Sequence, residues 1–591
     1  MSHAFQKMGT MPSGVVYRAR RAVRRGLLIV WILFTVAALA GMYRLWWQRE
    51  RRLYLGKDIF LQRQAVLNRA GIPSAVLESF SKIDSSWPKK IHYKASGDPN
   101  TLSFLTYLLI PRIPSGSSEY GIHAGRDKIV YWGKVDSKRG PPTDDVRPGA
   151  KGLILSVLLV SLVALGIQAA CHAGGINFPT FFGISCLLLM CFSLVSVWIW
   201  ENARYGFWIY SGLGVIGGGT FVYHRIRIRL KDTLSSSSRP GRRQVQPLSG
   251  FLFALGIFSF MLALLMAVIV GPDDWDAWAI WGAKAKVLAL AREPLQSVTY
   301  FGHADYPLLW PTIWAFSGWC AGGWEEHWGK GWGPVFMVLT ALQIYLLLRR
   351  WTGRSERALL GAVLFLSIPL VPMVASWGYA EAPLWLMTTG SFGCMLRWQE
   401  KNSPFDLLLS ALLATAAAYT KNEGVLFSAV SLLWILSIAP KKWKEAFLFY
   451  VLPFVLLYLP WFYWTQVVMG MGSHAVDGIY LNFRSILRAF QRLPEAADLI
   501  AGIWLDIRQW NLVLWMIGFG SAYGLLRGNR RERLEILVPA TLLAGFLGVI
   551  LFHYQNLAWQ VGTSWNRLTL QCVPLFILVL GRQTGWLVGN D

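Results

Sequence analysis

Cysteine and charge are both scarce in this 591-residue chain, and their patterns exclude several classes of protein. The six cysteines lie mostly within apolar segments and show no metal-type spacing, so we expect neither a disulfide framework nor a zinc site. Charged residues make up 15% of the chain, with 57 Lys and Arg against 32 Asp and Glu. Because much of the basic excess lies in short segments between apolar runs, it indicates membrane topology, and we expect no nucleic acid partner.

Apolar residues are abundant instead. They account for 54% of the chain, and the mean hydropathy is +0.40. This composition is too apolar for several soluble domains and predicts an all-α polytopic membrane protein. The 31 tryptophans fit belts at the two membrane interfaces. We find no internal repeat of the kind that many transporters show.

The chain divides into four predicted parts. Residues 1–47 read as a basic N-terminus followed by an uncleaved anchor helix from Gly26 to Trp47. Residues 48–150 have the turn formers and short strand candidates of a small soluble α+β domain, which we expect on the extracytoplasmic side. Three transmembrane helices and a basic cytoplasmic loop fill residues 151–248, and about ten further spans fill residues 249–591.

Apolar periodicity and length place these helices. With the anchor they make roughly fourteen spans. They are expected near 152–172, 177–199, 205–223, 249–270, 333–348, 358–374, 380–397, 405–420, 424–439, 446–468, 509–526, 535–552 and 567–582.

Basic loops set the predicted orientation. If the loop that follows Arg225-Ile-Arg-Ile-Arg-Leu-Lys231 is cytoplasmic, every other strongly basic short loop falls on the same side. We therefore expect a plasma membrane protein with cytoplasmic N- and C-termini. The opposite, extracytoplasmic side then receives 271–331, 377–383, 420–424, 469–507 and 553–567, where the polar residues collect.

An acidic segment after the helix near 249–270 is the sharpest chemical signal. Asp273, Asp274 and Asp276 follow Gly271-Pro272, and Lys284 and Lys286 come about two helical turns later. A carboxylate base and a cationic phosphate clamp could thus share one cleft, with Asp276 and Asp274 as the base candidates. The structural alternative is a solvated cluster that favours the N-terminus of a helix.

Other polar residues are predicted on the same side, each with a structural alternative. His303 and Asp305 precede two prolines that stiffen their loop. Glu381 begins a helix, where it could simply act as a cap. In Thr420-Lys-Asn-Glu-Gly424 the alternative is a mutual ion pair of Lys421 with Glu423, and for Arg567 at the start of the last helix it is an interfacial anchor.

These motifs, in this order, resemble those of a known group of membrane enzymes. The acidic loop, Tyr306-Pro-Leu-Leu-Trp-Pro311, Tyr379-Ala-Glu-Ala-Pro383, Thr420-Lys-Asn-Glu-Gly424 and Ser564-Trp-Asn-Arg567 resemble the GT-C superfamily of lipid-linked-sugar glycosyltransferases. The chain is similar to the branch of protein O-mannosyltransferases and lipid A aminoarabinose transferases, over about 249–585. Residues 1–248 match nothing in those enzymes.

The resemblance implies residue roles. The catalytic Asp of the first outer loop falls on Asp276, with Asp274 as its rival, and the second acid falls on Glu381. The resemblance also matches Lys421 and, as a donor-phosphate ligand, Arg567. Some relatives hold a divalent ion such as Mg²⁺, Mn²⁺ or Zn²⁺ with these carboxylates, here Asp274, Asp276 and Glu381. A bacterial inner membrane and an undecaprenyl or other polyprenyl phosphate donor are implied in the same way.

The sequence thus predicts an integral-membrane inverting glycosyltransferase that uses a polyprenyl-phosphate sugar and an extracytoplasmic acceptor (glycan, lipid or protein). Glu381, His303 and Asp305 are expected to orient the acceptor, and Lys284, Lys286, Lys421 and Arg567 to hold the donor phosphate. Sugar or lipid contacts are expected from Trp278, Tyr306, Tyr379 and Glu423. The alternative function is a secondary transporter or lipid flippase, with Glu381, Lys421 and Glu423 on an ion-coupled path.

Overall fold

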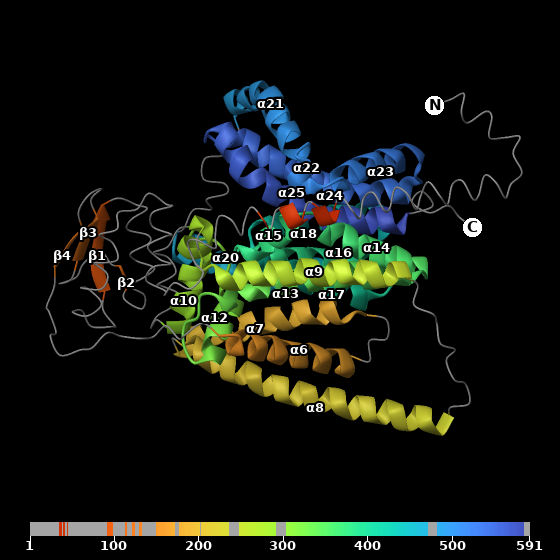
Figure 1. The fold of residues 1–591 in the computed structure, drawn as a ribbon, viewed down its shortest axis with the longest axis horizontal. Coiled ribbons are helices and arrows are strands. Elements are labelled where there is room, and N and C mark those ends of the chain that lie inside the picture. The colour runs from red at the N-terminus through yellow and green to blue at the C-terminus, as the bar shows by residue number, and fades with distance from the viewer. Residues whose placement is uncertain are drawn as a thin grey trace, which may run out of the picture.

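The computed structural model describes a helical membrane protein (Figure 1). The described residues are 149–171, 176–200, 202–235, 247–272, 274–290, 303–470 and 482–583, with short strands between 92 and 132 and a few helical residues between 35 and 44. Most of the predicted anchor helix lies outside the described residues. Every other predicted helix is found, which confirms the all-α polytopic class.

Three helices precede the region of the charged motifs: α6 (Lys151–Ala170), α7 (Phe178–Trp200) and α8 (Ala203–Ser235). They pack on one another, and α6 and α8 approach closely where Gly166 meets Gly217. A Cβ added to Gly166 would lie 2.3 Å from the Cα of Gly217, so this contact requires glycine. Helix α8 runs beyond the predicted end at 223, because no glycine or proline interrupts its basic C-terminal segment.

The next segment carries the acidic motif. Helix α9 (Pro247–Ile269) is followed by the π-helix η2 (Asp276–Gly282), α10 (Ala283–Leu290), α12 (Leu309–Ala321) and the 3₁₀ turn η4 (Trp328–Gly331). A helix therefore begins at Asp276, so the acidic segment does lie at a helix N-terminus. Helix α12 has only 13 residues, too few to cross a bilayer, so the span pattern did not reveal it.

Six helices form the centre of the molecule, and one predicted span among them is broken. They are α13 (Trp332–Thr352), α14 (Ser355–Leu366), α15 (Leu370–Ser376), α16 (Glu381–Lys401), α17 (Pro404–Thr420) and α18 (Glu423–Ile438). Helices α14 and α15, expected as one span, meet at an angle of 63°. Pro369 stands in this break, where it cannot continue the ladder of backbone hydrogen bonds.

The C-terminal part begins with a span that alternates between helix types: η5 (Pro440–Lys442), α19 (Trp443–Ala446), η6 (Phe447–Val451), α20 (Leu452–Tyr463) and η7 (Trp464–Val468). It ends with α21 (Phe483–Trp504), α22 (Ile507–Trp510), α23 (Val513–Arg527), α24 (Arg530–Phe552) and α25 (Leu557–Arg582). The segment 469–507, expected as an outer loop, thus contains a 22-residue helix, α21. Its apolar residues alternate with charged ones, so it lacks the continuous apolar run of a span.

The N-terminal region contains a sheet of four short strands in the order β2-β1-β3-β4: β1 (His92–Gly97), β2 (Ile113–Pro114), β3 (Gly121–Ala124) and β4 (Ile129–Trp132). Strand β1 is parallel to β2 and β3, and β3 is antiparallel to β4, with Gly121 opposite Trp132. Short strands, which the sequence suggests for residues 48–150, are therefore present. The rest of 48–150 lies outside the described residues, so its α+β character stays a prediction.

Membrane crossing can be judged by length and composition. Six helices of the described residues are long and apolar enough to span, or seven if α14 and α15 count as one bent span. The other predicted spans are helical but shorter or more polar. Many of the tryptophans are buried inside the protein. The largest fully buried side chains are Trp278, Trp281, Trp310, Trp314, Trp324, Trp332, Trp385, Trp398, Trp510 and Trp565.

Candidate active site at the ends of four helices

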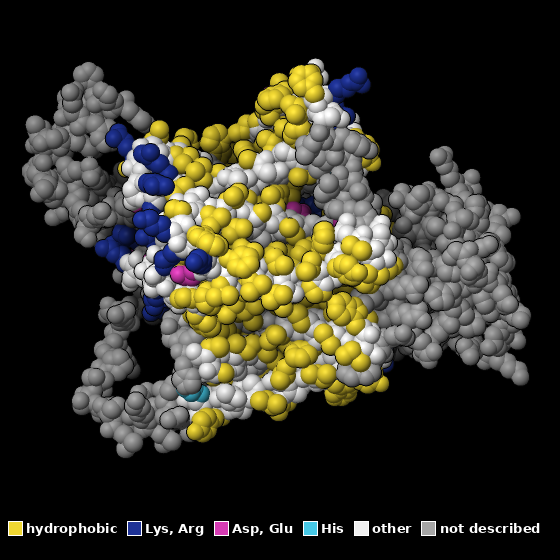
Figure 2. Space-filling view, turned by 180° about the vertical axis from the view of Figure 1, so that it is seen from behind, with side chains coloured by type: hydrophobic (Ala, Val, Ile, Leu, Met, Phe, Trp, Pro, Cys, Tyr) yellow, Lys and Arg dark blue, Asp and Glu magenta, His cyan; other side chains and the backbone are white. Residues whose placement is uncertain are grey.

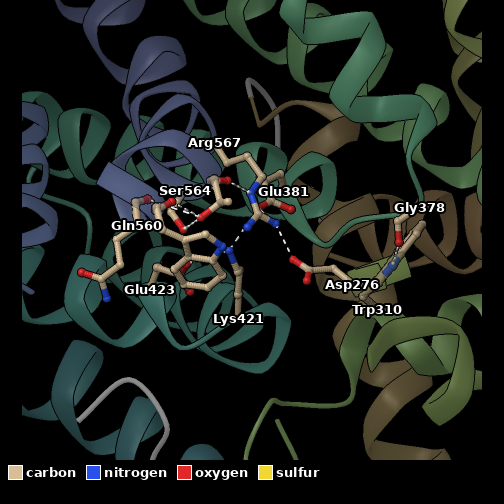
Figure 3. A network of polar contacts seen from close by, with 11 residues as sticks. Asp276, Trp310, Gly378, Glu381, Lys421, Glu423, Gln560, Ser564 and Arg567 are labelled. Atoms are coloured by element: carbon tan, nitrogen blue, oxygen red, sulfur yellow. Dashed lines mark hydrogen bonds and ion pairs between the residues drawn. The ribbon is translucent and has the colours of Figure 1, made fainter. Parts of the chain in front are cut away.

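Five charged side chains from distant parts of the sequence meet at one place, four of them at helix ends and Arg567 within a helix (Figure 3). Arg567 donates to Asp276 Oδ2 at 2.6 Å and lies 3.7 Å from Glu381 Oε1. Lys421 donates to the same Glu381 oxygen at 3.0 Å and pairs with Glu423 Oε1 at 2.7 Å. These five residues are called the charge cluster below.

Local sequence explains why the carboxylate of Glu381 faces the cluster. Gly378 has a φ of +84°, which glycine adopts without strain, and its carbonyl accepts a hydrogen bond of 2.9 Å from Trp310 Nε1. This turn leads into α16, whose first residue is Glu381. The carboxylate therefore lies at a helix N-terminus, where the macrodipole favours negative charge.

Lys421 reaches the same point from another direction. It follows α17 with an extended backbone (φ −161°, ψ 151°), so the chain turns there before α18 begins at Glu423. Burial alone would lower the pKa of Lys421, but the Glu381 and Glu423 charges outweigh burial and raise it above the ordinary value. The ammonium therefore stays charged, and the predicted mutual ion pair with Glu423 is present.

Glu381 is the most buried acid of the charge cluster. Its exposed fraction is 0%, and its second oxygen, Oε2, has no hydrogen-bond partner among the described residues. A buried carboxylate is costly unless it is paired, so Lys421 and Arg567 compensate its charge through Oε1. The unpartnered Oε2 leaves one strong acceptor for a group that the protein itself does not supply.

Arg567 connects the two acids, and its place in the helix differs from the prediction. Helix α25 begins ten residues earlier, at Leu557, where the side chain of Asn556 accepts from the backbone N–H of Trp559. Arg567 thus lies within α25, and the expectation that it starts the last helix is wrong. The polar stretch 557–566 is helical because it has a good N-cap and no proline. The guanidinium lies 4.8 Å from the ring centroid of Tyr379, a cation–π contact that fixes its plane.

Asp274 stands at the edge of the charge cluster. It is exposed, and its backbone carbonyl accepts from Ala277 and Trp278 at the start of η2. Burial first, and then the Asp276 and Asp274 carboxylates, raise the pKa of Tyr379, so its hydroxyl keeps the proton and can donate to Asp274. Asp274 and Asp276 therefore share one neighbourhood, while Asp273 lies outside the described residues.

The loop from His303 to Tyr306 comes close to the charge cluster through Asn422. Asn422 Nδ2 donates to Asp305 Oδ2 at 2.8 Å, whereas the buried Asp305 Oδ1 has no hydrogen-bond partner in the described part of the chain. His303 stacks on Tyr306, with ring centroids 4.6 Å apart, and Tyr306 stacks on Trp281. Asn422 was not among the predicted site residues, although its place between Lys421 and Glu423 was a signal.

Of the two lysines expected to hold the donor phosphate, Lys284 has its printed partners in the loop from His303 to Tyr306. Lys284 is fully buried, and its ammonium donates to the carbonyls of His303 at 2.5 Å, Tyr306 at 3.0 Å and Ala304 at 3.4 Å. With three acceptors bound, Lys284 holds the loop that bears Asp305. Lys286 is 2% exposed.

Aromatic side chains expected to contact sugar occupy two kinds of position. Trp278 is 1% exposed and packs near Trp275, with ring centroids 6.4 Å apart, so it supports the acidic segment from inside. Tyr379 and Tyr306 instead lie beside charged residues of the site. Gln560 and Ser564 on α25 also stand near Arg567 and were not predicted (Figure 3).

The carboxylates do not fit the divalent ion that the resemblance implies. Within the described ranges, no group of three or more His, Cys, Asp or Glu side chains could hold a metal. Asp276 and Glu381 already bond a guanidinium and an ammonium, which would have to leave before a cation could bind. The suggested ligand set Asp274, Asp276 and Glu381 is therefore not a metal centre in this structure.

Several residues of the site lie in a segment that is similar to a known protein family. The family model described as dolichyl-phosphate-mannose-protein mannosyltransferase matches residues 333–464, which include Tyr379, Glu381, Lys421 and Glu423. No curated protein and no solved structure matches the chain. The match confirms the resemblance predicted from the motifs. Over residues 333–464 the chain is thus similar to this GT-C family, whose members are membrane glycosyltransferases that use a lipid-linked sugar donor.

Proposed function

We propose that the charge cluster transfers a sugar from a polyprenyl-phosphate donor to an acceptor hydroxyl, with inversion at the anomeric carbon. One observation carries the proposal: Arg567 and Lys421 both contact the same Glu381 oxygen, and the Arg567 nitrogen that does so also bonds Asp276. Two cations beside a candidate base match what an inverting transfer from a phosphate requires.

In this reaction the acceptor oxygen attacks the anomeric carbon on the face opposite the phosphate. The new carbon–oxygen bond forms as the bond to the phosphate oxygen breaks, and the phosphate takes that electron pair. Arg567 and Lys421 stabilise the charge that develops on the phosphate. The acceptor proton passes to a carboxylate, for which Asp276 is the first candidate and Asp274 the second.

Glu381 has a different role in this proposal, because two cations already occupy its Oε1. It holds Lys421 and Arg567 close together, and its unpartnered Oε2 can accept a hydrogen bond from a hydroxyl of the sugar or the acceptor. Asp305 Oδ1 offers a second buried acceptor beside Asn422. These two oxygens suit a ligand that carries several hydroxyl groups.

The active site is proposed to face the extracytoplasmic side. Helix α16 begins at Glu381 and ends at Lys401, so the charge cluster and the basic last turn lie about 30 Å apart. Lys and Arg side chains gather at one end of the molecule in Figure 2. By the positive-inside rule we expect the basic end to be cytoplasmic and Glu381 to lie on the opposite side of the membrane.

A transfer assay tests the proposal. Purified protein in lipid vesicles is given polyprenyl-phosphate sugars with a radiolabelled sugar, mannose first, and a membrane extract as the source of acceptors. We expect transfer by the wild type and by Glu495→Gln, an exposed charge change on α21, and loss of transfer in Asp276→Asn or Asp274→Asn.

The outcome for the two aspartates identifies the base. Loss in one variant that still binds the donor assigns the proton acceptor to that residue. If neither substitution reduces transfer, the proposed chemistry is wrong. If no donor supports transfer by the wild type, an assay of lipid translocation in the same vesicles tests the transporter alternative.

A further inference from the structure

Helix α21 has a side that packs on the protein. Its buried residues Ser485, Ala489, Ala496 and Ile500 follow helical spacing and lie against α24 and α25. The N-terminus is fixed by a capping box in which Asn482 and Ser485 exchange hydrogen bonds. This helix is thus an ordered part of the structure, held along one side.

A second side of α21 is apolar and exposed. At 100° per residue, the apolar side chains that avoid the packed side fall within an arc of about 120°. The exposed fractions are 74% for Phe483, 40% for Ile486, 47% for Leu487, 69% for Phe490 and 40% for Leu493. Large aromatic and aliphatic groups exposed to this extent require an apolar environment.

A third side is polar along most of the helix. Arg484, Arg488, Gln491, Glu495 and Asp498 fall in an arc of about 80° next to the apolar arc. Burying all of these groups in hydrocarbon would be unfavourable, at about 2.5 to 3.5 kcal/mol for each charged residue at a bilayer centre. A helix with one apolar and one polar exposed side is stable at an interface between the hydrocarbon of the membrane and water.

The place of α21 in the molecule agrees with such a boundary. In Figure 1 it lies at the periphery, outside α25, and does not run along the bundle as α9 does. From behind, Figure 2 shows a projection at this place that is rich in hydrophobic side chains and has Lys or Arg at its tip. The neighbouring helix α24 is long and apolar enough to span the membrane and exposes Leu537 and Val549. The apolar side of α21 can therefore continue a lipid-facing surface.

Hydrogen bonds connect α21 to the helix that carries Arg567. Arg492 donates to the carbonyls of Leu551 at 3.1 Å and Gln555 at 2.7 Å, at the corner between α24 and α25. At the other end of α21, Trp504 Nε1 donates to Thr569 Oγ1 on α25 at 3.2 Å. The position of α21 and the position of α25 are thus coupled.

We propose that α21 is an interfacial helix whose partner is the bilayer surface. Phe483, Leu487 and Phe490 enter the boundary between headgroups and acyl chains, and the polar side, with Arg484, faces the lipid phosphates and water. The proposal is independent of the transfer reaction. It adds a lipid contact that braces α25 near the charge cluster.

Site-directed spin labelling tests this orientation. Phe490→Cys and the adjacent Gln491→Cys are made in the full chain with Cys171→Ser, because Cys171 is the exposed native cysteine. Each protein is labelled with a nitroxide in vesicles of phosphatidylcholine and phosphatidylglycerol, and collision rates with oxygen and with a water-soluble nickel chelate are measured. The two positions are about 100° apart around the helix, which makes them a matched pair.

Oxygen concentrates in the bilayer and the nickel chelate in water. We expect the oxygen-to-nickel collision ratio to be several-fold higher at position 490 than at 491. Equal ratios at both positions, whether both favour nickel or both favour oxygen, would overturn the proposal. Leu487→Cys with Arg484→Cys is a second pair, so that local misfolding at one site cannot decide the result.

Discussion

The ion pair between Arg567 and Asp276 leads to an unusual prediction about donor binding. In the structure Asp276 holds Arg567 at 2.6 Å, so a donor phosphate must compete with Asp276 for the guanidinium. The change Asp276→Asn removes the competing charge but leaves Arg567 and Lys421 in place. We expect this variant to lose transfer and yet to bind polyprenyl phosphate more tightly than the wild type.

The burial of the pair sets the size of the effect. The two side chains are 16% and 26% exposed, so solvent screens the pair less than an ion pair on the surface. Hydrogen bonds to charged groups contribute about 1.5 to 3 kcal/mol. If the phosphate no longer has to break this bond, the Kd should fall by about 10- to 100-fold, since about 1.4 kcal/mol corresponds to a factor of ten.

The assay is equilibrium binding of a tritiated polyprenyl monophosphate to purified protein in lipid nanodiscs. Asp274→Asn is the matched control, because it removes the same charge from the same neighbourhood but not the bond to Arg567. Equal or weaker binding by Asp276→Asn would refute the competition. Equal tightening by Asp274→Asn would show that net charge, and not the ion pair, controls the affinity.

Three further predictions concern the cations. Arg567→Met should weaken binding of polyprenyl monophosphate in the same nanodisc assay by at least tenfold, because Lys421 alone then holds the phosphate; unchanged affinity would exclude this role. Lys421→Met should destabilise the fold by about 3 to 5 kcal/mol, because Glu381 loses its shortest ion pair. The double variant Lys421→Met with Glu381→Gln should recover part of this stability. Thermal unfolding in detergent measures both variants, and equal unfolding midpoints for the single and double variants would argue against this coupling. Burial, opposed in part by Asp305, lowers the pKa of Lys284 to about 7. Between this pKa and the ordinary lysine pKa of about 10.4, the unfolded chain binds more protons than the folded protein. The free energy of unfolding of the wild type should therefore rise with pH across this window, and more steeply than that of Lys284→Met. Parallel curves for the two proteins would contradict this prediction.

The positions of the helices could largely be predicted, because each apolar run is long enough to be recognised from composition. The bend between α14 and α15 could not, since prolines also occur in straight spans, and the sequence does not show which carbonyl groups will lack a partner. Helix α21 was not predicted, because charged residues interrupt its apolar ones. Its pattern becomes visible only when residues are sorted by helical angle.

The site residues divide in a similar way. Glu381, Lys421 and Arg567 could be recognised as candidates because each is a charged residue beside an apolar segment. A charge buried there is costly unless it is paired, so such residues stand out in the sequence. Their pairing could not be predicted, since Arg567 and Asp276 are 291 positions apart. The partners of Lys284 could not be predicted either, because they are backbone carbonyls, which no side-chain pattern reveals.

The most direct test of the central claim is the fate of the donor. In vesicles with a polyprenyl-phosphate mannose labelled in both the lipid and the sugar, the wild type should release one polyprenyl monophosphate for each sugar transferred. Arg567→Met should show little of either product. Lipid monophosphate release without sugar transfer, or movement of the intact donor across the membrane without cleavage, would contradict the proposed glycosyl transfer.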